Sequence, residues 1–77
     1  MIVREPVLIT CEGRTVPGFI VLASENRKSL MIEFEAMLAG HVGSMALLQD
    51  DDGVYRSLIN RVEVTIRPRE SGGDGGE

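Results

Sequence analysis

Few residues in this chain of 77 have the types and spacing that catalysis or metal binding requires. His41 is the only histidine, and the spacing of the surrounding residues indicates no partner for it. An isolated histidine of this kind is expected to be structural or solvated. Cys11 is the only cysteine, and Glu12 beside it disfavours a thiolate. We therefore expect Cys11 to be a small core or half-buried residue.

The acidic run Asp50–Asp52 invites a calcium interpretation, but an EF-hand loop spaces its acids one residue apart and ends in glutamate. The residue at that last position is Arg61, so a hairpin turn ending at Gly53 is the better interpretation. Three serines have no general base that the sequence identifies: Ser24, Ser29 and Ser44. We therefore expect no enzyme, no bound metal and no cofactor.

Short runs of alternating apolar and polar residues, broken by turn residues, dominate the stretch from Val7 to Ile32. This pattern is typical of short, bent antiparallel strands. The sequence predicts an all-β fold, a small five- to six-stranded bent antiparallel barrel of the SH3-like or OB-like kind. The first strand begins at Val7, just after Pro6, and the others are Thr15–Ala23, Ser29–Phe34, Ser44–Gln49, Val54–Ile59 and Val62–Ile66.

Glycine, asparagine and aspartate mark the connections between these strands, at Glu12-Gly13-Arg14, Ser24–Lys28, Asp50–Gly53 and Asn60-Arg61. Asp-Gly suits a type I′ turn at the third connection, and Asn60 tolerates the left-handed region at the fourth. Pro17 and Gly18 predict a bulge near the start of the second strand. The segment Glu35–Gly43 is either a single helical turn capped by Gly40 or an irregular connection.

Residues 1–68 are expected to form one barrel domain, and the glycine-rich acidic residues 69–77 a disordered tail. We expect no signal peptide at the N-terminus, because Arg4, Glu5 and Pro6 interrupt any apolar core. The longest uncharged run, residues 36–49, is too short to cross a bilayer. We therefore expect a soluble cytoplasmic protein that does not bind a membrane.

Size and charge bear on the partners. A chain this short buries only roughly 60% of the surface of its unfolded form, so oligomerisation would help to stabilise it. The net charge of −4 and the scarcity of aromatic residues argue against a general nucleic-acid binder. The chain is rich in methionine and leucine, which we assign mainly to the core, with some left for an interface: Met31, Met37, Met45, Leu38, Leu47 and Leu48. Our first hypothesis is a non-catalytic, self-associating β-barrel module that binds another macromolecule, most simply a protein.

Strand edges suggest how subunits would associate. A small barrel of this pattern is expected to leave an edge with unpaired N–H and C=O groups. We expect such an edge near Ser44–Leu48, or along Val62–Ile66, to pair with a neighbouring subunit. A lysine at Ala46 or a proline at Val64 would then disrupt the assembly.

Two segments resemble the Sm-like (Lsm) proteins. Val7–Ile32 resembles their first motif, with Gly13 and Gly18 followed by an apolar strand, a polar turn and a second apolar strand. The stretch Leu58–Val64 resembles their second motif, in which a tight turn joins the last two strands. The resemblance implies a five-stranded barrel, a ring-like homo-oligomer assembled through edge strands, and RNA binding.

The residues that the family uses to bind a base do not all match. Ser24 and Lys28 stand where the family has aspartate and asparagine, and Asn60-Arg61 stands where it has arginine then glycine. The second hypothesis is therefore an Sm-like RNA binder that uses polar residues of two turns. These could converge if the barrel brings the turns together: Asn26, Arg27, Lys28, Asn60 and Arg61.

Overall fold

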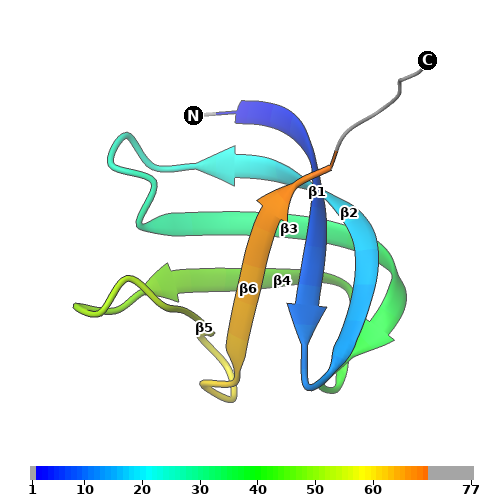
Figure 1. Cartoon of the computed structure of the whole chain (residues 1–77). Helices are drawn as coiled ribbons and strands as arrows, with labels where there is room; N and C mark the ends of the chain where they lie inside the picture. The colour runs from blue at the N-terminus through cyan, green and yellow to red at the C-terminus, as the bar shows by residue number, and fades with distance from the viewer. Residues whose placement is uncertain (1, 70–77) are drawn as a thin grey trace.

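Six antiparallel strands close into a single barrel in the computed structural model, which describes residues 2–69 (Figure 1). Each strand pairs with its neighbours in the chain, and the last pairs with the first. The strands are β1 (Ile2–Cys11), β2 (Arg14–Ala23), β3 (Ser29–Leu38), β4 (His41–Gln49), β5 (Tyr55–Ser57) and β6 (Glu63–Pro68). The prediction of a small, all-β, antiparallel barrel is confirmed.

The core is built from the alternate residues of these strands that point inward. Along β1, Val7, Ile9 and Cys11 are buried while the residues between them are partly exposed. Ile9 and Ile32 are completely buried at 0% exposure. Each such side chain stabilises the fold by roughly 1.5–3 kcal/mol relative to an exposed position. The barrel is thus filled by one apolar core that draws on every long strand.

Two hairpins turn on residue pairs that both have positive φ, the pattern of a type I′ turn. Glu12 and Gly13 have φ of 53° and 82°, and Ala39 and Gly40 have 49° and 84°. Segment 35–43 is therefore neither a helical turn nor an irregular connection. β3 continues through it to Leu38, and Leu38 pairs with His41. The pairing of β3 with β4 outweighs the helix propensity of residues 35–39.

The turn between β4 and β5 is correctly located but not of type I′. The Asp50 carbonyl accepts the Gly53 N–H at 3.0 Å, and only Gly53 within the turn has positive φ. The Asp50 carboxylate accepts the N–H groups of Asp52 and Val54 at 2.9 and 3.0 Å. The Asp50 side chain thus organises the loop through hydrogen bonds to the backbone. The conformational preference of an Asp-Gly pair would not by itself produce this arrangement.

The fifth strand is shorter than predicted. It ends at Ser57, and Leu58–Asn60 form a turn closed by the Arg61 N–H, which bonds to the Ser57 carbonyl at 2.9 Å. Arg61, not Asn60, takes the positive φ of 63°. The Asn60 side chain instead accepts the Val62 N–H at 3.2 Å, so the asparagine stabilises the turn from an ordinary conformation.

Prolines and bulges also differ from expectation. β1 begins at Ile2 and includes Pro6, whose carbonyl accepts the Arg69 N–H at 3.1 Å just beyond the end of β6. Proline has no N–H to donate, and on the side facing β6 Pro6 lies just beyond the last pair of the β1–β6 register. The missing donor therefore affects only the end of the β1–β6 pairing. Registers shift between Ile2 and Glu5, between Ile20 and Leu22, and between Glu33 and Met37, and not at Pro17 and Gly18.

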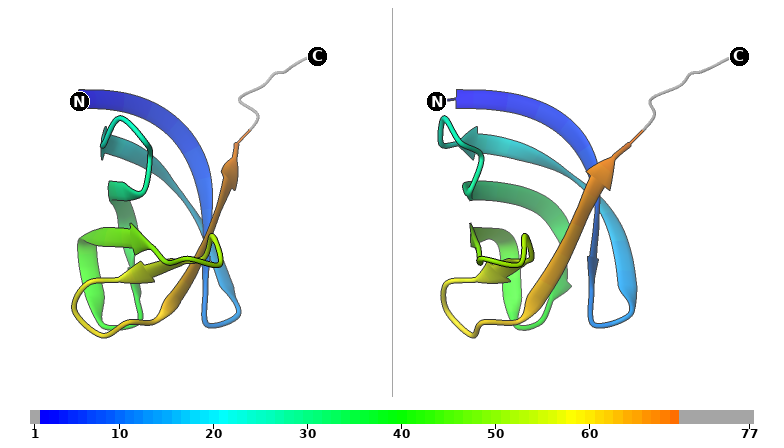
Figure 2. Two further views of the ribbon diagram at one scale, coloured as in Figure 1. Left: turned by 90° about the vertical axis from the view of Figure 1, so that its left-hand side faces the viewer. Right: turned by 60° about the vertical axis from the view of Figure 1, so that its left-hand side comes forward.

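Gly18 is required for a different reason. A Cβ at this position would collide with the Glu33 carbonyl oxygen and the Ile9 Cδ1 atom. Gly18 pairs with Phe34 and Val7 across its two neighbouring strands, so β1, β2 and β3 approach each other closely here. Glycine thus permits the tight curvature that the ribbons show in Figure 2.

The two strands expected to be open edges have partners on both sides for only part of their length. Val64 pairs with both Cys11 of β1 and Tyr55 of β5. Ala46 pairs with Met31, and its carbonyl accepts the Leu58 N–H at 3.1 Å. β6 closes the barrel, but Thr65 and Ile66 pair only with β1. Ser44 and Met45 likewise pair only with β3, so pairing of these strands with a neighbouring subunit stays a prediction. Of the expected tail, Arg69 is described and residues 70–77 lie outside the described part of the chain.

Candidate interaction surface

The most unusual surface of the barrel is apolar and lies on the outer face of β2, β3 and β4. Leu22 pairs with Met31, and Met31 pairs with Ala46, so these three side chains form a row across the strands. Leu58 joins the row through its N–H bond to the Ala46 carbonyl. Leu48 follows Ala46 on the same face of β4. We call these five residues the outer strip.

The outer strip is accessible to a partner. Leu22, Leu48 and Leu58 are 43%, 47% and 57% exposed. Leu22 and Leu58, with Met31 and Ala46 half-buried between them, border a shallow hollow of about 300 Å³. The outer face of an antiparallel sheet is normally polar when it faces water. Contiguous apolar side chains in its place are typical of a contact surface.

Sequence reasoning found part of this surface. Of the methionines and leucines assigned mainly to the core, Leu38, Met45 and Leu47 are buried at 1% exposure. Met37 and Leu48 are exposed. Leu22 and Leu58 were missed, although a signal exists. Apolar residues occupy both phases of the alternation in Val21–Ala23 and Met45–Leu48, which indicates strands that are apolar on both faces.

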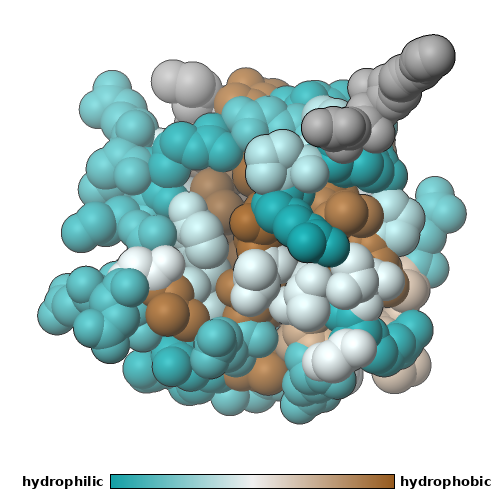
Figure 3. All heavy atoms as spheres, in the orientation of Figure 1, coloured by the Kyte–Doolittle hydropathy of each residue, from teal (hydrophilic) through white to brown (hydrophobic). Residues whose placement is uncertain are grey.

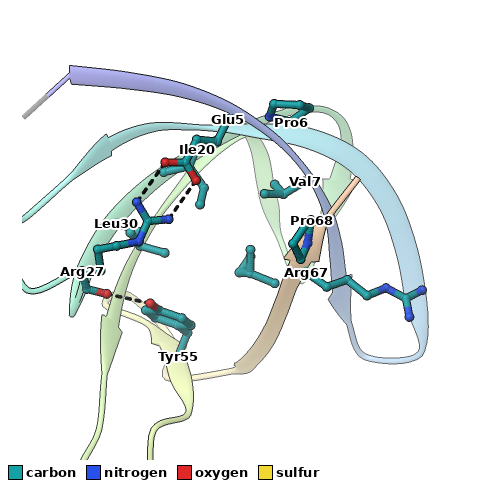
Figure 4. Close-up of a pocket in the computed structure, with 10 residues that line it drawn as sticks. Glu5, Pro6, Val7, Ile20, Arg27, Leu30, Tyr55, Arg67 and Pro68 are labelled. Atoms are coloured by element: carbon teal, nitrogen blue, oxygen red, sulfur yellow. Dashed lines mark hydrogen bonds and ion pairs between the residues drawn. The ribbon is translucent and has the colours of Figure 1, made fainter. Parts of the chain in front are cut away.

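The first predicted RNA-binding turn, Ser24–Lys28, uses much of its polar chemistry internally. The Asn26 carboxamide oxygen accepts the Ser24 hydroxyl at 2.8 Å and the Lys28 N–H at 3.0 Å. Arg27 makes a two-bond ion pair with Glu5, both at 2.9 Å, and its carbonyl accepts the Tyr55 hydroxyl at 2.6 Å (Figure 4). The Lys28 ammonium has no hydrogen-bonding or ionic partner among residues 2–69.

A small hollow of about 190 Å³ lies beside this turn, and Figure 4 shows the side chains around it. Core residues Val7, Ile20 and Leu30 line it, and the Glu5–Arg27 pair lies at its edge. Hydrophobic atoms are visible in the middle of this face between hydrophilic ones (Figure 3). The hydrogen bonds and charge of Arg27 lower the pKa of Glu5 below its ordinary value. The carboxylate therefore stays ionised and bound to Arg27.

The second predicted turn is also stabilised from within. The Asn60 carboxamide donates to the Ala39 carbonyl at 2.9 Å, which joins this turn to the β3–β4 hairpin. The Arg61 carbonyl accepts the Arg56 guanidinium at 3.3 Å, while the Arg61 side chain is exposed. Asn60 thus has a structural role, and Arg61 presents its charge to solvent.

The two turns do not converge. Lys28 directly precedes the first residue of β3, whereas Asn60 bonds to Ala39, directly after the last residue of β3. The strand separates them along its whole length. The structure therefore provides no common surface for the five predicted residues, and RNA binding by them stays a prediction.

His41 has a partner that the sequence did not indicate. Its Nε2 atom lies 2.9 Å from the Ser57 hydroxyl, and its Nδ1 atom lies 3.2 Å from the Ala39 carbonyl. With Nδ1 protonated toward that carbonyl, Nε2 accepts the serine proton, an arrangement that resembles a nucleophile and its base. However, Ser57 is only 1% exposed, and its oxygen also accepts the Ile59 N–H at 3.2 Å. The pair connects β4 to the Leu58–Asn60 turn.

Comparison with known proteins adds no assignment: no protein-family model, curated protein or solved structure matches the chain. Within residues 2–69, no helix has the length and apolar character needed to cross a bilayer. Function is therefore inferred from the surfaces and contacts of the barrel itself.

Proposed function

We propose that this protein is a non-catalytic β-barrel module that self-associates and binds protein through the outer strip. The single observation that supports this proposal is the row of Leu22, Met31, Ala46 and Leu58, apolar residues side by side on the outside of a closed barrel. Such a surface costs solubility unless a partner covers it.

The size of the molecule favours a second copy as the first partner. A domain of this length gains little stability from its own core, and association supplies the missing apolar burial. The flexible Met31 side chain at the centre of the outer strip also suits contact with a surface of different shape. A protein partner could therefore compete with self-association for the same residues.

Light scattering coupled to size exclusion tests this proposal. At high micromolar concentration the wild-type chain is expected to exceed its monomer mass of 8.4 kDa. Leu22→Lys and Leu58→Lys should each shift it toward the monomer. Val42→Lys is the matched control, because Val42 is 73% exposed but does not border the hollow of the outer strip. A monomeric wild type, or equal effects of all three variants, would refute the proposal.

Sm-like RNA binding is our second proposal, supported by the strongly bent barrel and by the exposed charges of Lys28 and Arg61. Fluorescence anisotropy with short uridine-rich and adenine-rich RNAs at low salt tests it. Binding is expected to weaken as salt rises and to weaken further in Lys28→Gln and Arg61→Gln. No binding at tens of micromolar would end this proposal.

A further inference from the structure

Two arginines from opposite ends of the described chain lie against one aromatic ring. The guanidinium carbon of Arg4 is 4.3 Å from the centroid of the Phe19 ring, and that of Arg69 is 5.0 Å from it. Arg4 belongs to β1 and Arg69 directly follows β6, so closure of the barrel brings them together. The negative face of the ring attracts each guanidinium and so stabilises its position.

Neither of these guanidiniums has an acidic partner within the described part of the chain. The ion pairs there involve other arginines, Arg27 with Glu5 and Arg56 with Asp50. The hydrogen bonds of residues 2–69 likewise leave the side chains of Arg4 and Arg69 without an acceptor, although each guanidinium carries five donors. Two like charges are thus held near each other with their donors available to an anion.

Two carboxylates lie in the same surface hollow as the two arginines, and they determine which further groups a ligand must have. The hollow has a volume of about 350 Å³ and is lined by Phe19, both arginines, Glu33 and Glu35. Glu33 pairs directly with Phe19 across β2 and β3, and both glutamates are exposed. A purely anionic ligand would be attracted by the arginines and repelled by the glutamates. A ligand with one anionic group and several N–H donors would satisfy both.

We propose that this hollow binds a guanine nucleotide. A phosphate accepts the paired donors of a guanidinium at Arg4 and Arg69. The base offers adjacent N–H donors to a carboxylate at Glu33 or Glu35, and its flat face can stack on a guanidinium plane. The volume is within the range of small-ligand sites, roughly 300–1,000 Å³. The site is separate from the residues of the outer strip, so it goes beyond the proposed protein interface.

Amide NMR titration of the full chain with 5′-GMP tests the proposal. GMP is expected to shift the amides of Arg4, Phe19, Glu33 and Arg69 in a saturable way. Arg4→Gln and Arg69→Gln should each weaken binding roughly tenfold, as expected when a charged partner of a phosphate is lost. Arg14→Gln is the control, because it removes the same charge from an exposed residue that does not line the hollow.

Other titrations separate the base from the phosphate. Glu33→Gln should weaken GMP binding while leaving any binding of inorganic phosphate unchanged or stronger. Binding of guanosine as tight as that of GMP, or of inorganic phosphate as tight as that of GMP, would overturn the proposal. So would an equal loss in Arg14→Gln. A short uridine RNA with a single guanine distinguishes a free nucleotide from a strand, and binding of either through Arg4 and Arg69 supports the site.

Discussion

Single side chains in this barrel differ mainly in whether their polar atoms have partners. Ser57 and His41 form a hydrogen bond with each other inside the fold. Asp50 and Asn60 accept hydrogen bonds from backbone N–H groups of their own turns. Arg4 and Arg69 instead contact an aromatic ring and keep their donors available. Besides the exposed charges of Lys28 and Arg61, two residues with available donors therefore lie together on the outer surface beside Phe19.

Cys11 provides a test of burial at one residue. It is 2% exposed, and burial, followed by the charge of Glu12, raises the pKa of its thiol. We expect it to react with a thiol reagent at mildly alkaline pH at least roughly tenfold more slowly in the native protein than in guanidinium chloride. Absorbance of the released thiolate measures both rates. Equal rates would show that Cys11 is accessible in the native state.

Gly18 provides a test of close packing between strands. Gly18→Ala should lower the free energy of unfolding by about 1–3 kcal/mol, because the new methyl group meets backbone that cannot move aside. Urea denaturation measures the loss. Ser44→Ala, at an exposed position on β4, is the control and should change stability by no more than about 0.5 kcal/mol. An unchanged Gly18→Ala protein would contradict the close approach of β2 and β3.

The strands show how one element can serve the core and the surface at once. On β4, Met45 and Leu47 point inward, whereas Ala46 and Leu48 belong to the outer strip. On β3, Ile32 is buried while Met31 is half-exposed. The same short strands thus supply both the apolar core and the proposed contact surface.

Neighbouring leucines on β4 should respond differently to truncation. Leu47→Ala should cost about 2–5 kcal/mol because it leaves a cavity in the core, where Leu47 is 1% exposed. Leu48→Ala, at 47% exposure, should change the stability of the monomer by no more than about 0.5 kcal/mol. Thermal and urea denaturation at low protein concentration measure both. Similar losses in the two variants would mean that the inward and outward faces are misassigned.

Alternation of apolar residues was enough to predict the strands around Val7–Ile32 and the antiparallel barrel. It failed between Glu35 and Gly43 because Ala39-Gly40 forms a type I′ turn without the usual asparagine or aspartate. It also extended the fifth strand beyond Ser57, because Leu58 and Ile59 are apolar although exposed in a turn. The Arg4–Phe19–Arg69 cluster depends on barrel closure, and the His41–Ser57 bond depends on how β5 packs against β4, neither of which local sequence encodes.

On the scale of the whole molecule, closure joins segments that are distant in sequence. β1 pairs with β6, the Glu5–Arg27 ion pair connects β1 to the turn after β2, and Asn60 connects the last turn to the β3–β4 hairpin. These links explain why the candidate surfaces combine residues from different strands. They also make the stability of the barrel sensitive to charges at its rim.

The Glu5–Arg27 pair predicts the response of the molecule to acid. Because the pKa of Glu5 is lowered in the folded state, its contribution is present above its unfolded pKa and is lost as pH falls through the folded value. Both side chains are partly exposed, so the pair should contribute only about 0.2–1 kcal/mol at neutral pH.

Urea denaturation of the wild type and Glu5→Gln at several pH values tests this. The two proteins should differ in stability at neutral pH and converge as pH falls through the lowered folded pKa of Glu5. A gap that stays constant down to strongly acidic pH would mean that ionisation of Glu5 does not stabilise the barrel. Glu25→Gln, at an exposed residue of the Ser24–Lys28 turn without an ion pair among residues 2–69, is the control.

The pairing of β1 with β6 also has a consequence for synthesis on the ribosome. The hairpins formed by β1 through β4 connect consecutive segments, so each can form as it emerges. β1 must wait for Val64–Pro68 before its second side is covered. Until then the nascent chain presents the backbone of Val7–Cys11 together with their apolar side chains. A pause in translation before β6 would therefore prolong the interval in which another nascent chain can add a strand there and aggregate.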